Sequence, residues 1–275
     1  AAREQSECNR LSIEWFEQRL AAAQMQIEKD FAAYRISDAL LVAYRLFWDE
    51  FSGWLLEMVK PAYGDSIDEC TLKAVKSIFE RLMQMLHPFM PFITEEIWQD
   101  IAERAEGESI CVSAAKVAEE ADEKLLARFE LAKEVISAVR NVRKQKNLPN
   151  KDALTLKVIV DENYPAEYEA VITKMANLTS VERVEEKDAT AAAFIVKTTQ
   201  YFVPLGGLID VEAERKKMSE ELTYLEGFLA SVMKKLSNER FVSSAPEKVV
   251  ANERAKKADA EAKIAAIKER LEQLK

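Results

Sequence analysis

Apolar residues recur at every third or fourth position along the first half of the chain, which is the spacing of amphipathic helices. The period holds over residues 8–31, 37–58, 66–86, 94–104 and 122–146, with polar residues between. Five stripes of this kind can all be buried when the helices pack antiparallel around a single core. The sequence therefore predicts a five-helix bundle.

A double-proline sequence, LHPFMPFITEEIW at residues 86–98, marks the corner between the third and fourth predicted helices. Pro88 and Pro91 cannot both lie inside one helix, because proline lacks a backbone donor and crowds the preceding turn. The third helix is predicted to end near His87, and Thr94 is predicted to cap the fourth. The apolar residues around the prolines indicate a packed corner.

The period changes to two after residue 153, where apolar and polar residues alternate as in a half-buried strand. A short helix is expected at residues 168–177. The expected strands are residues 154–160, 179–184, 193–198 and 200–204. Together these elements predict a small α/β module that follows the bundle.

The apolar positions of residues 218–236 and 250–274 alternate in steps of three and four, which is the heptad spacing of a coiled coil. Pro246 suits the first turn of the second helix. The sequence thus predicts an antiparallel hairpin whose seam becomes polar at Glu253 and Lys257.

The predicted fold class is mainly α, with three domains in sequence order. Residues 1–150 form the antiparallel helical bundle, residues 151–207 the small α/β connector, and residues 208–275 the C-terminal antiparallel coiled-coil hairpin. Six glycines and seven prolines among 275 residues favour long regular helices with few tight turns, in agreement with this class.

The composition excludes several classes of protein. No run approaches the roughly 18 apolar residues of a membrane span, and the amino terminus lacks the apolar core of a signal peptide, so a soluble cytoplasmic protein is expected. Cys8, Cys70 and Cys111 are far apart in sequence, and His87 is the only histidine. The sequence predicts no metal site, no cysteine–histidine pair, no catalytic residue and no cofactor in this chain, and it assigns His87 a structural role.

The net charge of −9 counts against binding to nucleic acid, but the charges are unevenly distributed. Residues 210–275 carry 14 basic and 13 acidic side chains, whereas the rest of the chain carries 25 basic and 35 acidic ones. Any contact with phosphates must therefore come from local basic patches.

Three groups of residues are candidate RNA contacts, and each has a structural alternative. Cations at the end of the fifth helix could bind phosphates or simply complement the helix dipole. Cations near the tip of the hairpin could bind phosphates or form an ordinary solvated surface. Aromatic residues of the second helix could stack on unpaired bases or form a core. The groups are, in that order, Arg140, Arg143, Lys144, Lys146 and Lys151; Lys234, Lys235, Arg240, Lys248, Arg254, Lys256 and Lys257; and Arg35 with Tyr34, Phe47, Trp48, Phe51 and Trp54.

Several of these sequences resemble class I aminoacyl-tRNA synthetases for branched aliphatic amino acids. The corner HPFMPFITEEIW is similar to one shared, in variants, by the anticodon-binding domains of isoleucyl, leucyl and valyl enzymes. YRISDA at residues 34–39 and VISAVRNVR at residues 135–143 are similar to the valyl bundle. KLSNERFVSSAPEKVV at residues 235–250 resembles the coiled-coil arm of the valyl-tRNA synthetase family, whereas isoleucyl enzymes carry a cysteine-ligated zinc module in this region.

The resemblance covers nearly the whole chain and implies a tRNA-binding C-terminal piece of a bacterial valyl-tRNA synthetase, in which the first helix of the family's bundle is missing. It implies that the full enzyme is a monomer that uses ATP to attach valine to valine-specific tRNA, with catalytic and editing domains N-terminal to this piece. Alone, the piece is expected to hold the anticodon stem-loop and the elbow of tRNA without catalysing anything. Another class I synthetase, isoleucyl or leucyl, and a coiled-coil adaptor with no RNA role are the alternatives.

Overall fold

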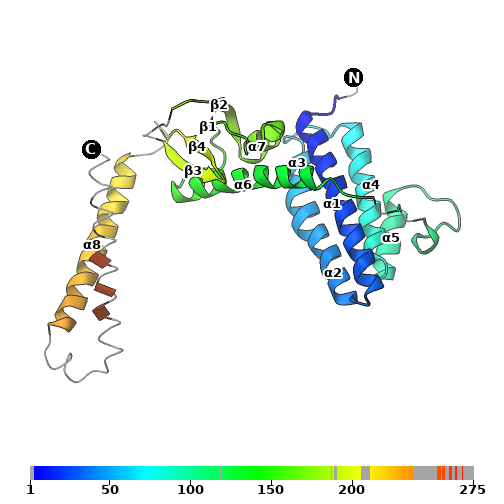
Figure 1. Ribbon diagram of the computed structural model, residues 1–275, viewed down its shortest axis with the longest axis horizontal. Helices are drawn as coiled ribbons and strands as arrows, with labels where there is room; N and C mark the ends of the chain where they lie inside the picture. The colour runs from blue at the N-terminus through cyan, green and yellow to red at the C-terminus, as the bar shows by residue number, and fades with distance from the viewer. Residues whose placement is uncertain are drawn as a thin grey trace. The chain divides into compact units, whose positions relative to one another are not determined.

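The computed structural model describes residues 3–114, 116–117, 119–186, 188, 191–205 and 211–237, together with residues 253, 254, 256, 257, 260, 261, 264 and 268. The chain divides into two compact units, residues 1–204 and residues 205–275 (Figure 1). The first unit contains the predicted bundle and the predicted α/β module, and the second contains the predicted hairpin. The boundary proposed at residue 150, inside the first unit, remains a prediction.

The bundle forms as the apolar period predicts. A single continuous helical segment consists of α2, a π-helical stretch η1 and α3, and it corresponds to the second predicted helix. The bounds are α1 Glu7–Ala32, α2 Ile36–Arg45, η1 Leu46–Leu55, α3 Leu56–Val59, α4 Glu69–Leu86, α5 Pro91–Ile101 and α6 Glu123–Gln145. The mainly helical fold class is therefore confirmed.

The corner and the start of α5 both differ from the prediction. Met90, Phe92 and Ile93 are exposed, so the expectation that they form a packed corner is wrong. The helix begins at Pro91, and Thr94 is a buried residue inside it rather than its cap. The Thr94 hydroxyl donates a hydrogen bond to the carbonyl oxygen of Met90 at 2.8 Å. Proline is well suited to the first helical position, because its fixed φ matches the helix and its missing donor is not needed there.

The core of the first unit is a chain of aromatic contacts. The Trp15 ring of α1 stacks on Phe129 of α6 with centroids 4.4 Å apart, and Phe129 meets Tyr168 edge-on at 4.9 Å. Phe129 is fully buried and Trp15 nearly so. Because Tyr168 belongs to η3, the short 3-10 helix Ala166–Tyr168, these rings connect the bundle directly with the module that follows it.

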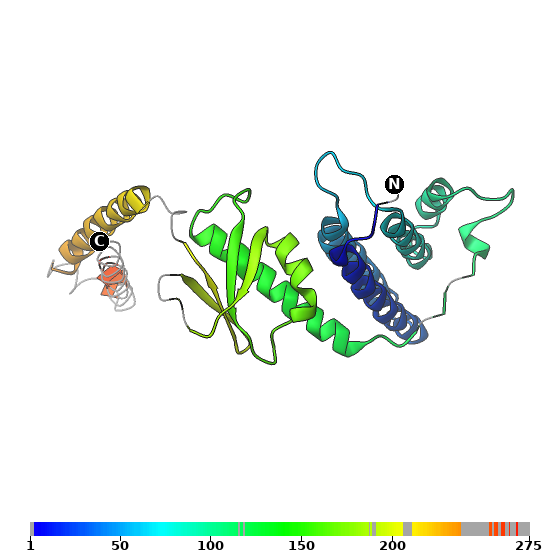
Figure 2. The same cartoon turned by 90° about the horizontal axis from the view of Figure 1, so that it is seen from above.

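The module is a four-stranded mixed sheet in the order β2-β1-β4-β3. Strands β1 and β2 are parallel and are connected through α7, while β4 is antiparallel to both β1 and β3. The α6 helix lies along one face of this sheet (Figure 2). The bounds are β1 Leu154–Ile159, α7 Glu169–Met175, β2 Leu178–Arg183, β3 Ala192–Val196 and β4 Thr199–Val203.

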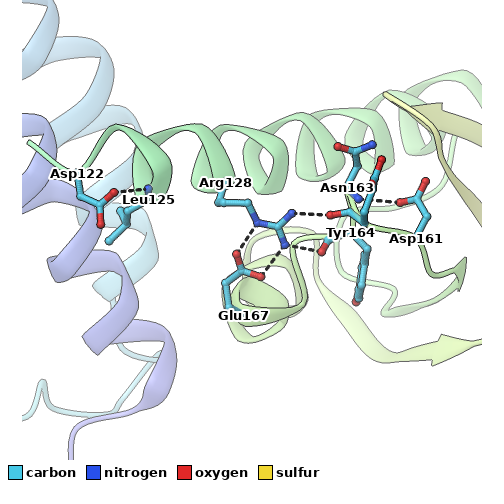
Figure 3. Close-up of polar contacts among 8 residues, drawn as sticks. Asp122, Leu125, Arg128, Asp161, Asn163, Tyr164 and Glu167 are labelled. Carbon is cyan, nitrogen blue, oxygen red and sulfur yellow. Dashed lines mark hydrogen bonds and ion pairs between the residues drawn. The ribbon is translucent and has the colours of Figure 1, made fainter.

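An arginine on the first half of α6 fixes the module to the bundle. Arg128 forms two hydrogen bonds with the Glu167 carboxylate, at 2.7 and 2.8 Å, in the planar fork geometry of this pair. Its remaining donors reach the carbonyl oxygens of Glu162 and Tyr164 (Figure 3). Asp122 caps the start of α6, and its carboxylate accepts a hydrogen bond from the Leu125 amide. As a result, α6 belongs to both the bundle and the module.

The second unit contains α8, Val211–Leu236, and helical residues that return beside it. Lys235 contacts Glu253 at 3.8 Å, and Glu226 contacts Lys268 at 2.8 Å. Residues that come later in the returning segment pair with residues that come earlier in α8. The two segments therefore run antiparallel. The predicted seam is confirmed where it is described, because Val232, Ala260 and Ile264 are buried along it.

Candidate nucleic-acid interface

The basic group at the end of α6 is only partly available to a ligand. Arg140, Lys144 and Lys151 are exposed, and Lys146 is half-buried. Arg140 donates to the carbonyl oxygen of Met175 at 3.1 Å, and its guanidinium carbon lies 5.5 Å from the centre of the Trp54 ring. The exposed members of this group can still present positive charge to a phosphate.

Arg143 must be removed from this group, because the structure places it inside the protein with an exposed fraction of 4%. Its guanidinium donates four hydrogen bonds to backbone carbonyl oxygens, at distances from 2.7 to 3.1 Å. The acceptors belong to Pro149, Asp152, Ala176 and Asn177. The side chain therefore holds the loop after α6 against the loop after α7 and is not available to RNA.

Tyr34 has an unusual conformation at the junction of α1 and α2. Its φ of 58° lies in the left-handed region, which bulky residues rarely adopt. The Tyr34 amide bonds to the carbonyl oxygen of Phe31 at 3.0 Å, and the Arg35 amide bonds to that of Asp30 at 2.8 Å. This pair of bonds is the Schellman motif that ends a helix, in which glycine usually occupies the left-handed position. The Tyr34 ring is 90% exposed, so no packing explains a tyrosine here.

Arg35 strengthens the same junction. Its guanidinium donates a hydrogen bond to the Asp30 carboxylate at 2.5 Å, and the Asp30 side chain is only 2% exposed. The Arg35 side chain itself is 50% exposed, and its Nε lies 3.9 Å from the Asp38 carboxylate. Arg35 can therefore face a ligand, but two carboxylates already offset much of its charge.

The aromatic group of the second helix divides into core and surface. Phe51 is buried, and the rings of Phe47, Phe51 and Phe79 pack together with centroids 5.6 to 6.1 Å apart. Trp54 is half-buried, whereas Trp48 is 61% exposed. Of the four aromatic residues considered on this helix, Trp48 is therefore the one that can stack on an external base.

Sequence analysis missed an exposed apolar stripe on α2 that ends at Trp48. Ile36, Leu40 and Tyr44 recur every four residues, so they lie on one helical face, and their exposed fractions are 39 to 55%. The spacing that identifies them also describes a core stripe, and the pattern alone could not separate the two. With Tyr34 at one end and Trp48 at the other, this stripe is the apolar part of the candidate surface.

The described part of the hairpin presents fewer uncompensated cations than the sequence suggested. Glu253 is buried, with Lys256 at 2.7 Å and Lys235 at 3.8 Å from its carboxylate. The hydrogen bond from Lys256, supported by the charge of Lys235, keeps the pKa of Glu253 below its usual value. Lys235 and Lys256 thus neutralise the buried Glu253. Lys234 and Arg254 are exposed.

The remaining predicted residues of the hairpin have separate outcomes. Lys257 is half-buried and lies 3.7 Å from the Glu261 carboxylate. Arg240 and Lys248 lie outside the described residues. These two positions stay predictions from the sequence.

The bundle corner also differs from the prediction. Nε2 of His87 lies 3.1 Å from Sγ of Cys111, so the expectation that the chain contains no cysteine–histidine pair is wrong. All three cysteines are free. Among the residues that the structure describes, no group of three or more His, Cys, Asp and Glu side chains is placed to hold a metal ion. In the same described part of the chain, no helix has both the length and the apolar character needed to cross a membrane.

Two family models match the chain. Residues 14–160 match the anticodon-binding domain of tRNA ligase, and residues 210–275 match the valyl tRNA synthetase tRNA binding arm. The chain is 50% identical over 265 residues to the valine–tRNA ligase of Parabacteroides distasonis, which covers 96% of this chain and 30% of that relative. It is 50% identical over 271 residues to that of Phocaeicola vulgatus, covering 98% and 31%, respectively.

A more distant relative matches over the same share of the chain. The valine–tRNA ligase of Listeria innocua is 35% identical over 283 residues, which covers 98% of this chain and 32% of that relative. The chain therefore spans about three-tenths of the length of the curated relatives it matches. The matches cover no catalytic domain.

Proposed function

The chain belongs to the family of anticodon-binding domains of tRNA ligases, as the anticodon-binding and arm region of a valyl-tRNA synthetase, and from that premise we propose that it binds valine-specific tRNA through the bundle and the hairpin. The full-length protein would use ATP to attach valine to this tRNA in the cytoplasm, as a monomer. ATP and valine would be handled by catalytic and editing domains that are not part of this sequence. The observation that carries the proposal is the match of both family models to consecutive parts of one chain.

The proposed contribution of this region to the reaction is positioning. The bundle would hold the anticodon stem-loop while the hairpin rests on the elbow, and two distant contacts fix the orientation of a rigid RNA. A fixed orientation lowers the entropic part of the barrier to a reaction at the other end of the molecule. The apolar stripe of α2 with Tyr34 supplies stacking surfaces, and exposed cations supply phosphate contacts.

The names of the relatives favour valine over the other amino acids of this subclass, because the relatives described above are all valine–tRNA ligases. A coiled-coil adaptor that binds only protein is disfavoured by the family match of residues 210–275 to a tRNA binding arm. Charging assays on the full-length protein with valine, isoleucine and leucine tRNA would separate the synthetase alternatives.

Reversing two exposed charges of the hairpin tests the proposed phosphate contacts. Lys234→Glu with Arg254→Glu is preferable to changing Lys235 or Lys256, because those two stabilise the buried Glu253. At about 50 mM salt the double variant is expected to bind valine tRNA about tenfold or more weakly than the unmodified chain, since each lost phosphate contact also forfeits counterion release. Filter binding measures the affinity.

The matched control reverses two exposed lysines of the first unit, with Lys76→Glu and Lys124→Glu, so that the net charge changes equally. It is expected to weaken binding much less. Binding by the unmodified chain should fall steeply between about 50 and about 300 mM salt. Equal losses in both double variants, or affinity that does not respond to salt, would contradict a specific electrostatic role for the hairpin.

Replacing Tyr34 with glycine is expected to change stability and RNA binding in opposite directions. Glycine removes the cost of a left-handed conformation, so the free energy of unfolding should rise by about 0.5–1 kcal/mol. The loss of an exposed ring should weaken tRNA binding by about 1–3 kcal/mol if the ring stacks on a base. Thermal denaturation and filter binding on the same preparation measure the two effects, and a stabilised variant with unchanged affinity would exclude Tyr34 from the interface.

A further inference from the structure

His87 and Cys111 meet at the corner of the bundle, although 24 residues separate them in the sequence. Nε2 of His87 lies 3.1 Å from Sγ of Cys111, and Nδ1 of the same ring lies 2.8 Å from Oγ1 of Thr94. Cys111 is exposed and His87 is half-buried. A thiol, an imidazole and a hydroxyl are thus connected in a row that opens to solvent at the sulfur.

The direction of the hydrogen bonds assigns the imidazole a base-like role. The Thr94 hydroxyl proton is committed to the carbonyl oxygen of Met90 at 2.8 Å, so Oγ1 accepts a hydrogen bond from Nδ1–H of His87. The neutral ring then has its lone pair on Nε2, the atom that faces the thiol. This is the arrangement in which an oriented base receives a proton from a nucleophile.

The loop that carries Cys111 is held on both sides of the cysteine. The Glu95 carboxylate accepts hydrogen bonds from the Ser109 hydroxyl at 2.7 Å and from the Ile110 amide at 3.1 Å. Gln84 of α4 donates to the Ser113 hydroxyl at 2.9 Å. The sulfur is therefore kept at the ring by contacts that precede and follow it in the chain.

We propose that Cys111 is a modification site, an imidazole-activated thiol that exchanges with low-molecular-weight disulfides. In the step, the thiol proton passes from Sγ to Nε2 of His87, and the thiolate attacks one sulfur of the disulfide. A new disulfide bond joins Sγ to that sulfur as the original S–S bond breaks. The departing thiolate takes the proton from the imidazolium, so Cys111 is oxidised, the other half of the disulfide is reduced, and His87 returns to its neutral form.

An ionised carboxylate holds the loop that carries Cys111. Glu95 faces the pair from α5, and hydrogen bonds from Gln99 and then Ser109 keep its pKa below the usual value, so it is ionised at neutral pH. From α4 the facing groups are His87 itself and the neutral Gln84.

The test measures the rate of reaction with 5,5′-dithiobis(2-nitrobenzoate), an aromatic disulfide that releases a coloured thiolate. The 275-residue chain carries Cys70→Ser, so that Cys111 is its exposed thiol, and it is compared with the same chain carrying His87→Asn. Asparagine can keep a hydrogen bond to Thr94 but cannot accept the thiol proton. At pH 6 the chain with His87 is expected to react about five- to tenfold faster.

The pH profile separates activation from mere contact. Above about pH 10 the advantage should vanish, because a thiol is then ionised without the help of a base. The chain with Cys70→Ser and Cys111→Ser reports the contribution of the buried Cys8. Parallel pH profiles with and without His87 would overturn the proposal.

A second comparison covers the case in which His87→Asn does not fold. The pH profile of the Cys70→Ser chain is then compared with that of the Cys111→Ser chain, whose exposed thiol is Cys70. An inflection for Cys111 at the same pH as for Cys70, or above it, would overturn the proposal. An inflection at lower pH supports it.

Discussion

Replacing Arg143 with alanine is expected to lower the free energy of unfolding of the first unit by about 3–5 kcal/mol. The side chain is 4% exposed and donates to four backbone carbonyl oxygens. Alanine cannot replace any of these donors, and a buried acceptor without a partner loses the hydrogen bonds that water provides in the unfolded chain. The loops after α6 and α7 would then be held together mainly by their apolar contacts.

Chemical denaturation followed by circular dichroism measures this effect, and two variants define its origin. Arg140→Ala removes an arginine one helical turn earlier that is exposed and makes one backbone hydrogen bond, so it should cost at most about 1 kcal/mol. Arg143→Lys keeps the charge but not the planar fork of donors, and it should retain only a minor part of the stability. A lysine variant as stable as the unmodified chain would show that charge alone, and not the four directed bonds, matters.

The contrast between Arg140 and Arg143 also shows where sequence reasoning reached its limit. Both are cations near the end of one predicted helix, and the sequence treats them alike. Their difference arises because α6 continues along the sheet, so that the Arg143 side of the helix is covered by loops at residues 149–152 and 176–177. The apolar period predicts the helix, but it does not say which loops from later in the chain will cover its polar positions.

The helices and strands themselves were predictable because their periods are long and regular. The predicted ranges for α1, α6 and the four strands lie within a few residues of those observed. The hairpin followed from its heptads, and the ion pairs of Lys235 with Glu253 and of Glu226 with Lys268 bear out its direction. Periodicity reports which face of an element is buried, and for this protein that was enough to define the fold class.

The features that the sequence did not predict depend on contacts between residues distant in sequence or on backbone conformation. His87 and Cys111 come together through loop contacts made by Glu95 and Gln84, which no local pattern indicates. Tyr34 adopts the left-handed conformation, which a sequence usually reveals by a glycine at that position. In both places the missing signal was the specific packing of a turn, and both are now candidate functional positions.

The second large effect is expected at Phe129, where alanine should lower the free energy of unfolding by about 4–5 kcal/mol. The ring is fully buried, stacks on Trp15 at 4.4 Å and meets Tyr168 at 4.9 Å. Removing it leaves a cavity between α1 and α6 and also deletes two aromatic contacts. The loss exceeds that of an ordinary core residue because this ring joins the bundle to the module.

Phe92→Ala is the matched control, since the Phe92 ring is 89% exposed and the chemical change is identical. It should alter the free energy of unfolding by less than about 0.5 kcal/mol. Proteolysis adds a spatial readout: in Phe129→Ala the contacts of Arg128 with Glu167 and of Arg143 with the loops still tie the module to α6. Because the deleted ring contacts Trp15 of α1 and Tyr168 of the module, cleavage should increase in both parts. Faster cleavage confined to the module would show that the two parts are not coupled through Phe129, and that the arginine contacts alone join them.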